Sequence, residues 1–466
     1  EITQQEVCDM IKYKIKVKKA PGMDKITGQI LRELPAKAVR KLVLIFNATL
    51  RLEYIPSSWK MAEVIMIPKA GKPPEQPASY RPISLLSIIG KLFERLYLKR
   101  LMPLIEERKL IPDHQFGFRQ KHSTIEQIHK VVDVIEKALE NKKVVSAVFL
   151  DAAQAFDKVW HDGLLSKLRA ILPGNHVRLL ESYLTDRKFR VRYEDSLSTF
   201  RDILAGVPQG SVLGPILYIL FTRDIPRTRG TQLVTFADDT YILAVFDDLQ
   251  SANVKVQTGL NQVSDWTKKL RIGLQGQKSV HTIFTNKKVG HDPIYLHGNV
   301  VPYSDSAKYL GLTLDAKLRW KVHVKKKRSE LNLKFRKMYW LLGRKSKLSI
   351  YNKALLYKQI LRPVWAYGIQ LWGCTAKSNL KIIQTFQNKV LRAIVDAPMY
   401  TRNADIHRDL NIETVQEVAL RLASSYEMRI DNHPNATVDH LFDREVLRRL
   451  KRTKTFELSS GNFLFR

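Results

Sequence analysis

The sequence of 466 residues is longer than one domain usually is, and its 44% hydrophobic and 26% charged residues are typical of a globular protein. Lysine and arginine number 78 against 45 aspartate and glutamate residues, so the net charge is +33, and the isoelectric point near 10 indicates a phosphate-rich partner. Two cysteines without a spacing pattern argue against a disulfide framework or a zinc site, and no apolar run approaches the roughly 18 residues that span a bilayer. We therefore expect an intracellular protein without a membrane partner, and the first residue, Glu1, indicates a fragment of a longer polyprotein.

Two capping-box patterns predict the starts of helices. Thr3 with Glu6, and Ser123 with Glu126, supply the hydroxyl and carboxylate that cap a helix reciprocally. The second pattern opens a segment whose apolar residues recur at helical spacing. These residues are Ile125, Ile128, Val131, Val132, Ile135 and Leu139. We expect this helix to bury one face.

Residues 144–150 form an almost unbroken apolar run of strand length, VVSAVFL. Such a run predicts a strand that is buried on both faces. Asp151 follows it directly. A carboxylate at the end of a buried strand is held rigidly, which suits a metal ligand.

The segment from Gly206 to Pro215 is rich in glycine and proline and runs into the apolar residues 216–221. This pattern predicts a loop and then a helix, with Gly214 or Ser211 as a plausible cap. The three glycines would let the backbone approach a flat ligand closely. The alternative is purely structural, because loop-to-helix junctions are often rich in these residues.

Asp238 and Asp239 lie between two runs of β-branched and aromatic residues, 233–236 and 240–245, which predicts a hairpin with acids at its tip. Taken alone, the pair is ordinary turn chemistry, since aspartate bonds its own backbone in tight turns. Together with Asp151 it makes a set of oxygen ligands. Phosphoryl transfer on two Mg²⁺ ions roughly 4 Å apart needs such a set.

Three strings in this order resemble motifs of reverse transcriptases: 149–151 (FLD), 207–210 (VPQG) and 236–239 (FADD). Further blocks similar to that family lie at 20–26, 67–72, 80–86, 115–119, 122–124, 278–279 and 309–312. The sequence is similar to the enzymes of non-LTR (LINE-type) retrotransposons, with the jockey-like group the nearest. The similarity runs from about residue 20 to about residue 315 and continues more weakly beyond.

The resemblance implies an α/β (α+β) fold of the right-hand polymerase type, with fingers, a palm of antiparallel sheet plus helices, and a thumb. A mainly α C-terminal region would follow. We predict a basic N-terminal region with fingers over 1–110, the palm with the remaining fingers over 111–300, a thumb-like basic helical region over 301–350, and the C-terminal extension over 351–466. In that extension, Trp365, Tyr367 and Trp372 are expected in the core.

By the same resemblance, Asp151, Asp238 and Asp239 would be the catalytic acids and the ligands of two Mg²⁺ ions, for which Mn²⁺ can substitute. The part of Asp239 in holding metal is the least defined of the three. Phe156 matches an aromatic residue that lies against the sugar of the incoming nucleotide and selects deoxynucleotides. A core phenylalanine is an equally good interpretation of Phe156.

Further matched residues concern the dNTP. Gln209 and Gly210 would lie beside the nascent base pair, and Arg81 and Lys69 would meet the triphosphate. The alternative for the two cations is a solvated basic surface. Lys278 matches a lysine that can protonate the pyrophosphate leaving group, although Gln275 stands where the family more often has Asn.

Basic residues concentrate between Lys317 and Lys347, where thirteen of them accompany one acid, Glu330. A thumb would there grip the template and primer duplex, mostly through phosphates. We assign this role to Lys317, Arg319, Lys325, Lys326, Lys327 and Arg328. For the interleaved aromatic residues Trp320, Phe335, Tyr339 and Trp340 we prefer a place in the core.

The function that follows is RNA-directed DNA polymerisation, in which element RNA is copied into cDNA, target-primed, from dNTPs. The expected partners are an RNA template, a DNA primer and target DNA. No endonuclease domain is recognisable in the sequence, so the nick would come from a domain or partner absent from this chain. We expect the protein in the nucleus at the integration step, after a cytoplasmic ribonucleoprotein stage.

Two other classes of function stay open. One is an inactive polymerase relic that only binds RNA, against which the three intact aspartates argue. The other is an intron-encoded, maturase-like splicing factor, although no maturase-like motif is recognisable. A ribonuclease H in the last 116 residues is disfavoured, because its candidate acids lie in a helix-like region. Those acids are Asp396, Asp405, Asp409 and Glu413.

Overall fold

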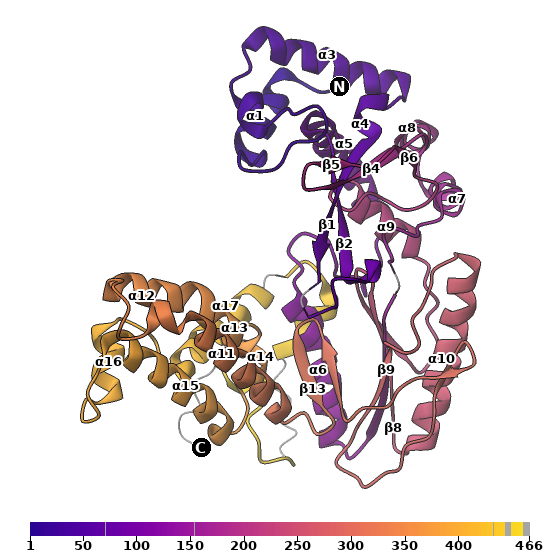
Figure 1. Ribbon diagram of the computed structural model, residues 1–466. Coiled ribbons are helices and arrows are strands. Elements are labelled where there is room, and N and C mark those ends of the chain that lie inside the picture. Colours follow the sequence, from indigo (N-terminus) through magenta and orange to yellow (C-terminus); the bar gives the residue numbers. More distant parts are fainter. Residues whose placement is uncertain (70, 153, 432, 443–448, 460–466) are drawn as a thin grey trace. The chain divides into compact units, whose positions relative to one another are not determined.

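The computed structural model describes residues 1–69, 71–152, 154–431, 433–442 and 449–459, and the chain forms two compact units (Figure 1). Unit 1 comprises Glu1–Phe118, Ala152–Pro226 and Gln262–Gln275, and unit 2 comprises Arg119–Asp151, Arg227–Asn261 and Gly276–Arg466. The two units alternate along the sequence. The division into fingers, palm, thumb and C-terminal extension as four consecutive regions stays a prediction from the sequence.

Unit 1 combines helices with a five-stranded sheet. Its elements are α1 (Gln4–Lys14), α2 (Gly28–Arg32), α3 (Ala36–Leu52), α4 (Ser57–Lys60), β1 (Met61–Pro68), η1 (Pro77–Ser79), β2 (Tyr80–Leu85), α5 (Ile88–Glu107), α7 (His161–Ile171), α8 (Gly174–Leu184), β4 (Lys188–Tyr193), β5 (Ser196–Leu197), β6 (Arg201–Asp202) and α9 (Gly214–Thr222). The strand order is β2-β1-β4-β5, with β6 paired to β4. β1 is antiparallel to β2 and parallel to β4.

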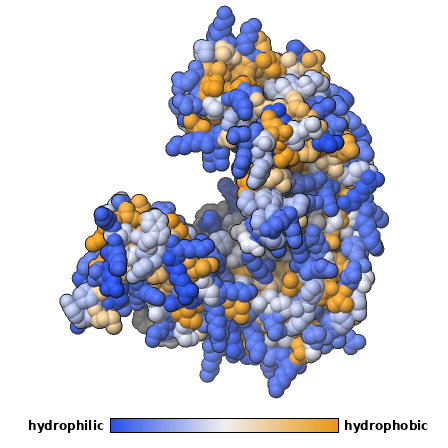
Figure 2. Space-filling view, viewed as in Figure 1, coloured by the Kyte–Doolittle hydropathy of each residue, from blue (hydrophilic) through white to orange (hydrophobic). Residues whose placement is uncertain are grey.

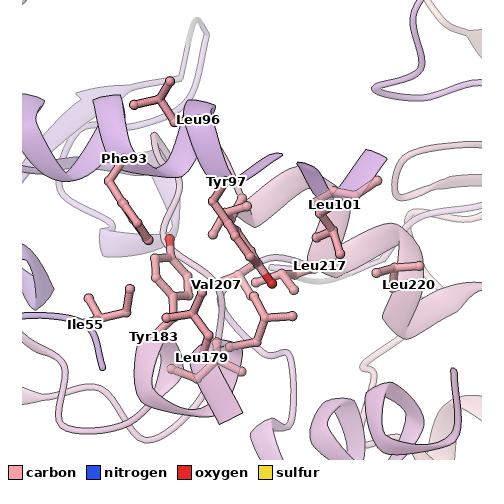
Figure 3. Packing of buried hydrophobic residues seen from close by; sticks show 14 of the residues in the cluster. Ile55, Phe93, Leu96, Tyr97, Leu101, Leu179, Tyr183, Val207, Leu217 and Leu220 are labelled. Atoms are coloured by element: carbon pink, nitrogen blue, oxygen red, sulfur yellow. The ribbon is translucent and has the colours of Figure 1, made fainter. Parts of the chain in front are cut away.

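The core of unit 1 joins α5, α8 and α9 (Figure 3). Phe93 and Tyr97 of α5 stack with ring centroids 6.2 Å apart, and the Tyr97 hydroxyl lies 2.9 Å from His176 Nδ1. Tyr183 of α8 and Leu217 of α9 are buried in the same cluster. Burying side chains of this size stabilises a fold by roughly 1.5–3 kcal/mol each. The core therefore fixes α5 and α9, the two helices next to the glycine-rich loop.

Unit 2 contains the other sheet and the C-terminal helices. Its elements are α6 (Thr124–Glu140), β3 (Val144–Leu150), β7 (Gln232–Phe236), β8 (Asp239–Phe246), β9 (Val280–Phe284), β10 (Tyr295–Leu296), β11 (Asn299–Val300), β12 (Ser306–Tyr309), β13 (Leu312–Asp315), α11 (Lys321–Leu342), α12 (Ile350–Leu356), the π-helix η2 (Tyr357–Leu361), α13 (Arg362–Ala366), α14 (Ile369–Trp372), α15 (Lys377–Val395), α16 (Asn403–Asp409), α17 (Val415–Ile430), η3 (Ala436–Phe442) and η4 (Thr455–Glu457). α10 (Leu249–Lys269) has residues in both units.

The main sheet of unit 2 is antiparallel, with the order β7-β8-β3-β9. All seven residues of β3 are buried, which confirms the predicted doubly buried strand. Phe149 of β3 lies directly opposite Tyr241 of β8, and their rings stack with centroids 3.8 Å apart. Cross-strand aromatic pairs of this kind fix the register of a sheet.

Helix α6 packs against β3 and β7 (Figure 1). All six apolar residues that defined its predicted inner face are buried, and its capping box at Ser123 and Glu126 is present. The capping box of Thr3 and Glu6 at the start of α1 is present as well. Both helix predictions are therefore confirmed.

The described residues after 350 contain helices and turns but no strand, which agrees with a mainly α region. Trp365 and Trp372 are buried as expected, but the prediction for Tyr367 is wrong, since 36% of its surface is exposed. Its hydroxyl donates to the Leu310 carbonyl (2.7 Å) and is hydrogen-bonded to the Thr124 hydroxyl (2.9 Å), partners that keep the polar end at the surface. Among the described residues, no helix is long and apolar enough to cross a bilayer.

Candidate active site

Three carboxylates gather at one end of the unit 2 sheet. Asp151 comes directly after the last residue of β3, while Asp238 and Asp239 lie at the turn between β7 and β8. Because β3 and β8 are antiparallel and pair Leu150 with Thr240, the end of β3 lies beside the start of β8. Backbone pairing alone thus brings residues from two distant segments to one place.

The turn that carries Asp238 has an unusual backbone. Phe236 pairs with Asp239, so the loop consists of Ala237 and Asp238 only. Ala237 has a φ of 56°, a region that alanine seldom adopts, and its side chain is buried. Such strain persists where the surroundings over-determine it, here through the two paired strands. The hairpin prediction is confirmed, and the turn is not an ordinary glycine turn.

The three carboxylates interact electrostatically. Desolvation by the surrounding protein, followed by the charges of Asp238 and Asp151, raises the pKa of Asp239 to about 6. The Asp239 side chain still reaches water, so the desolvation is partial. Clustered like charges that disfavour ionisation are typical of sites that bind a cation.

Lys278 lies at the same end of the sheet. Phe149 pairs with Val280 of β9, and the Asp151 amide donates to Ser279 Oγ at 3.3 Å, so the residues just before β9 lie beside Asp151. Ser279 is buried, and Lys278 is exposed. The structure therefore places the backbone of Lys278, two residues before β9, at the carboxylate end of the sheet.

The donor set fits a magnesium ion that is held jointly with a substrate. Carboxylate oxygens are ligands that Mg²⁺ prefers, and proteins usually hold it by one or two carboxylates together with phosphates and water. Within the described ranges, no group of three or more His, Cys, Asp or Glu side chains is arranged to hold an ion by itself. Asp151, Asp238 and Asp239 supply carboxylate oxygens of this kind at one end of the sheet.

Gln209 is fixed in unit 1 by two partners. Its side-chain amide donates to both carboxylate oxygens of Asp157 at 3.1 Å, and its backbone carbonyl accepts from the backbone amide of Ser84 at 2.9 Å. Burial raises the pKa of Asp157, while the Gln209 amide and the charge of Lys69 favour its ionised form. Sequence reasoning missed Asp157, although its place six residues after Asp151 is a usable signal.

The glycines of this loop face protein backbone. Gly206 has a φ of 93°, and a Cβ there would lie 2.6 Å from the Asp157 carbonyl oxygen. Gly210 has a φ of 118°, and its Cβ would lie 2.8 Å from the Ser84 carbonyl oxygen. The close approach that was expected toward a flat ligand is thus accounted for, at these two positions, by the protein itself.

A second residue that sequence reasoning missed holds the end of the loop. Glu94 of α5 is buried, and its carboxylate accepts from the amides of Val212 (2.6 Å) and Leu213 (2.9 Å). The N-cap of α9 is Leu213, so neither predicted cap, Gly214 or Ser211, takes that position, although the Ser211 hydroxyl accepts from the Gly214 amide at 2.9 Å. No spacing pattern in the sequence connects Glu94 to a loop 118 residues away.

Three further predicted dNTP contacts also lie in unit 1. Phe156 is half-buried, stacks on Tyr218 (ring centroids 4.8 Å apart) and meets Phe118 edge-on at 5.8 Å. It is therefore partly a core residue. Arg81 is exposed on β2, and the Lys69 ammonium donates to the Ala78 carbonyl at 2.8 Å.

The six predicted nucleic-acid contacts differ in exposure. Lys317, Arg319, Lys325 and Lys326 are exposed, and Lys327 is half-buried and pairs with Glu330 at 3.3 Å. Arg328 packs between helices instead, because its guanidinium donates to the Ile382 carbonyl (2.9 Å) and lies 5.2 Å from the Phe386 ring.

The expectation for the aromatic residues among these cations is half right. Trp320 and Phe335 are buried, as expected. Tyr339 and Trp340 are exposed, so their predicted place in the core is wrong. Both lie in the last turn of α11.

The middle of the chain matches one known protein family. Residues 67–314, more than half of the chain, match the family model "Reverse transcriptase (RNA-dependent DNA polymerase)". The chain belongs to this family, which confirms the predicted family and its right-hand polymerase fold.

Three relatives from Drosophila melanogaster resemble the chain over almost its whole length. It is 43% identical to "Probable RNA-directed DNA polymerase from transposon BS" (97% of this chain, 51% of that protein) and 41% identical to the corresponding protein of transposon X-element (100% and 52%). It is 39% identical to "RNA-directed DNA polymerase from mobile element jockey" (97% and 50%). The chain spans about half the length of these relatives.

Proposed function

We propose that this chain is the polymerase part of a non-LTR retrotransposon protein and copies element RNA into cDNA. The observation that carries the proposal is the grouping of Asp151, Asp238 and Asp239 at one end of an antiparallel sheet, in a chain of the reverse transcriptase family. The named relatives are RNA-directed DNA polymerases about twice as long, which supports the same activity here.

The three aspartates would be the catalytic acids. Two Mg²⁺ ions, for which Mn²⁺ can substitute, would be held by these carboxylates and would neutralise charge on the reacting phosphate. Desolvation and the charges of Asp238 and Asp151 raise the pKa of Asp239 to about 6, and a bound cation would lower it again by favouring the ionised carboxylate. The buried strand β3 keeps Asp151 in place throughout.

In the reaction, the primer 3′-hydroxyl oxygen forms a bond to the α-phosphorus of a dNTP, and the bond from that phosphorus to the bridging oxygen breaks. The hydroxyl proton leaves to water, and pyrophosphate departs in line. We assign protonation of the pyrophosphate to Lys278, an exposed ammonium beside Ser279. Catalysis of this kind is mainly positioning and charge stabilisation.

The unit 1 residues would serve the incoming nucleotide. Gln209 and Gly210 would support the nascent base pair, with Asp157 fixing the Gln209 amide. Phe156 would meet the sugar, while Arg81 and Lys69 would meet the triphosphate. Of these two cations Arg81 is the stronger candidate, because Lys69 already donates to Ala78.

The proposed partners are an RNA template, a DNA primer and a nicked DNA target, which places the copying step in the nucleus. Phosphate contacts would come from the exposed cations Lys317, Arg319, Lys325 and Lys326, and from the half-buried Lys327. Arg328 would act indirectly, by fixing α11 against α15. The endonuclease that makes the nick is proposed to reside outside the sequence described.

Primer extension with purified protein, Mg²⁺ and dNTPs on an RNA template tests the proposal. We expect wild-type extension, loss of extension in Asp238→Asn, and no change in Asp247→Asn, a matched control whose exposed carboxylate directly follows β8, at the end of the strand opposite to Asp239. A second readout is the thermal stabilisation by Mg²⁺, which Asp238→Asn should lose. RNA binding by wild-type protein without any extension would overturn the proposal in favour of an inactive relic.

A further inference from the structure

Trp340 is an exposed tryptophan with an unoccupied ring face. It lies in the last turn of α11, and 74% of its surface is exposed. Within the described part of the chain, its indole has no hydrogen bond, no ring neighbour and no cation above it. Large exposed aromatic side chains with a polar tip are enriched at binding surfaces.

The chain around Trp340 carries only positive charge. From Leu331 to Val395 the sequence contains no aspartate and no glutamate, but thirteen lysine and arginine residues. This stretch supplies most of α11 and all of α12, η2, α13, α14 and α15, of which α11, α12, η2, α13 and α15 pack against one another in unit 2. Figure 2 shows hydrophilic side chains (blue) interspersed with hydrophobic ones (orange) over these helices. A surface of this charge is complementary to a polyanion.

Several cations lie close to Trp340 along the helix. Arg336 and Lys337 precede it by one turn, on the same helix face, and both are exposed. Arg344, Lys345 and Lys347 follow in the linker to α12 and are exposed too. None of these five is engaged in an ion pair with another described residue.

A second exposed ring lies at the other end of the linker between α11 and α12. Tyr351, in the first turn of α12, has 75% of its surface exposed. The buried Lys353 donates to the Gly343 carbonyl at 3.1 Å, which ties α12 to the end of α11. We call the seven exposed residues at this junction of α11 and α12 the Trp340 surface: Arg336, Lys337, Trp340, Arg344, Lys345, Lys347 and Tyr351.

We propose that the Trp340 surface binds unpaired RNA, with a base stacked on the Trp340 ring and phosphates on the neighbouring cations. Bases within a duplex stack on one another, so their faces are not available to a protein ring. An aromatic ring among cations is the arrangement by which proteins hold single strands without reading their sequence. This use differs from the phosphate contacts to a duplex proposed above for Lys317 to Lys327. The choice of RNA rests on the proposed function, since the template is the single strand that such an enzyme must hold.

Fluorescence anisotropy with an unstructured RNA oligonucleotide and an RNA–DNA hybrid duplex, at one salt concentration, tests the surface. We expect Trp340→Ala to weaken binding of the single-stranded RNA by roughly tenfold and to leave hybrid binding within about twofold, given the usual worth of one base stack. Trp340→Phe should recover most of the loss. Tyr400→Ala, which removes an exposed ring from another part of unit 2, is the matched control and should bind like wild type. Thermal unfolding of each variant verifies its fold.

Equal losses on RNA and hybrid, or no loss on RNA, would overturn the proposal, and so would a larger loss on single-stranded DNA than on RNA. A separate measurement distinguishes this outcome from failure of the proposed function. If wild-type protein extends primers while Trp340→Ala binds RNA normally, only the Trp340 surface is wrong. If wild-type protein extends no primer but Trp340→Ala loses RNA, the surface stands and the polymerase proposal falls.

Discussion

The carboxylate end of the unit 2 sheet and the Gln209–Gly210 loop of unit 1 are held in place in different ways. Asp151, Asp238 and Asp239 are positioned by backbone pairing, since β3, β8 and β7 deliver them through an antiparallel ladder. The Gln209–Gly210 loop is positioned by individual hydrogen bonds. The Gln209 side chain is bonded to Asp157, the Gln209 backbone carbonyl to the Ser84 amide of β2, and the amides of Val212 and Leu213 to Glu94.

Because the two regions are held differently, substitutions in them should affect catalysis and stability differently. A ladder tolerates changes in side chains, so substituting an aspartate at the sheet end should alter the reaction and spare the fold. A loop held by a few buried polar contacts and two close backbone approaches should respond in the opposite way. Substitutions there should cost stability first and affect nucleotide use as a consequence.

The largest expected effect is that of Asp151→Asn on catalysis. Losing a carboxylate that would hold the Mg²⁺ ions, and with them the positive charge that neutralises the reacting phosphate, costs several kcal/mol of transition-state stabilisation, so primer extension should fall by about a thousandfold or more. The melting temperature should not fall, because the substitution also removes repulsion against Asp239. A parallel fall in melting temperature and activity would show that the sheet end depends on Asp151 structurally.

The second effect is that of Gly210→Ala on the loop. The added Cβ would meet the Ser84 carbonyl oxygen at 2.8 Å, and its φ of 118° strains any other residue. We expect a loss of about 1–3 kcal/mol in stability, seen as a lower urea midpoint, and a higher KM for dNTP. Gly290→Ala is the matched control, because a Cβ there meets nothing within 4 Å. Equal midpoints for the two variants would contradict the close approach at Ser84.

A smaller effect is expected from Glu94→Gln. Burial raises the pKa of Glu94, and its carboxylate serves two backbone amides, which the neutral amide side chain serves less well. The expected loss is about 1 kcal/mol of stability, together with a higher KM for dNTP and an unchanged kcat at saturation. Glu107→Gln, an exposed residue at the end of the same helix, should change neither quantity. A fall in kcat alone would show that Glu94 acts in another way.

The same contrast explains what the sequence could predict. The buried strand β3, the hairpin, α6 with its capping box, and α9 all follow from patterns of neighbouring residues, and the structure confirms each. Asp151 and the Asp238–Asp239 pair could be joined because a strand and a hairpin have few ways to pair. The family pattern then identified them as one set.

Contacts without a local pattern could not be predicted. Glu94 and Asp157 hold the Gln209 loop through bonds that only the tertiary fold creates. Exposure of Trp340 and Tyr367 was misjudged because composition says that aromatic rings are mostly buried, whereas their position on a helix or turn decides the outcome. The sequence likewise predicts Arg328 as a surface cation, because only the fold brings the Ile382 carbonyl and the Phe386 ring of α15 beside it.

The smallest expected effect concerns the pH dependence of stability at the carboxylate end. Asp239 has a pKa of about 6 in the folded chain against an ordinary 3.8, so between about pH 4 and pH 6 the folded state binds more protons than the unfolded state. The free energy of unfolding therefore falls as the pH rises through this window. Because the side chain reaches water, we expect a contribution of no more than about 1 kcal/mol to the free energy of unfolding.

Urea midpoints measured as a function of pH test this effect. In Asp239→Asn the curve should be flatter between about pH 4 and pH 6, whereas Asp247→Asn should keep the slope of wild type. Added Mg²⁺ should shift the window to lower pH in wild type by favouring the ionised carboxylates. An identical slope in Asp239→Asn and wild type would contradict the raised pKa of Asp239, and with it both the desolvation of this carboxyl group and its repulsion by Asp238 and Asp151.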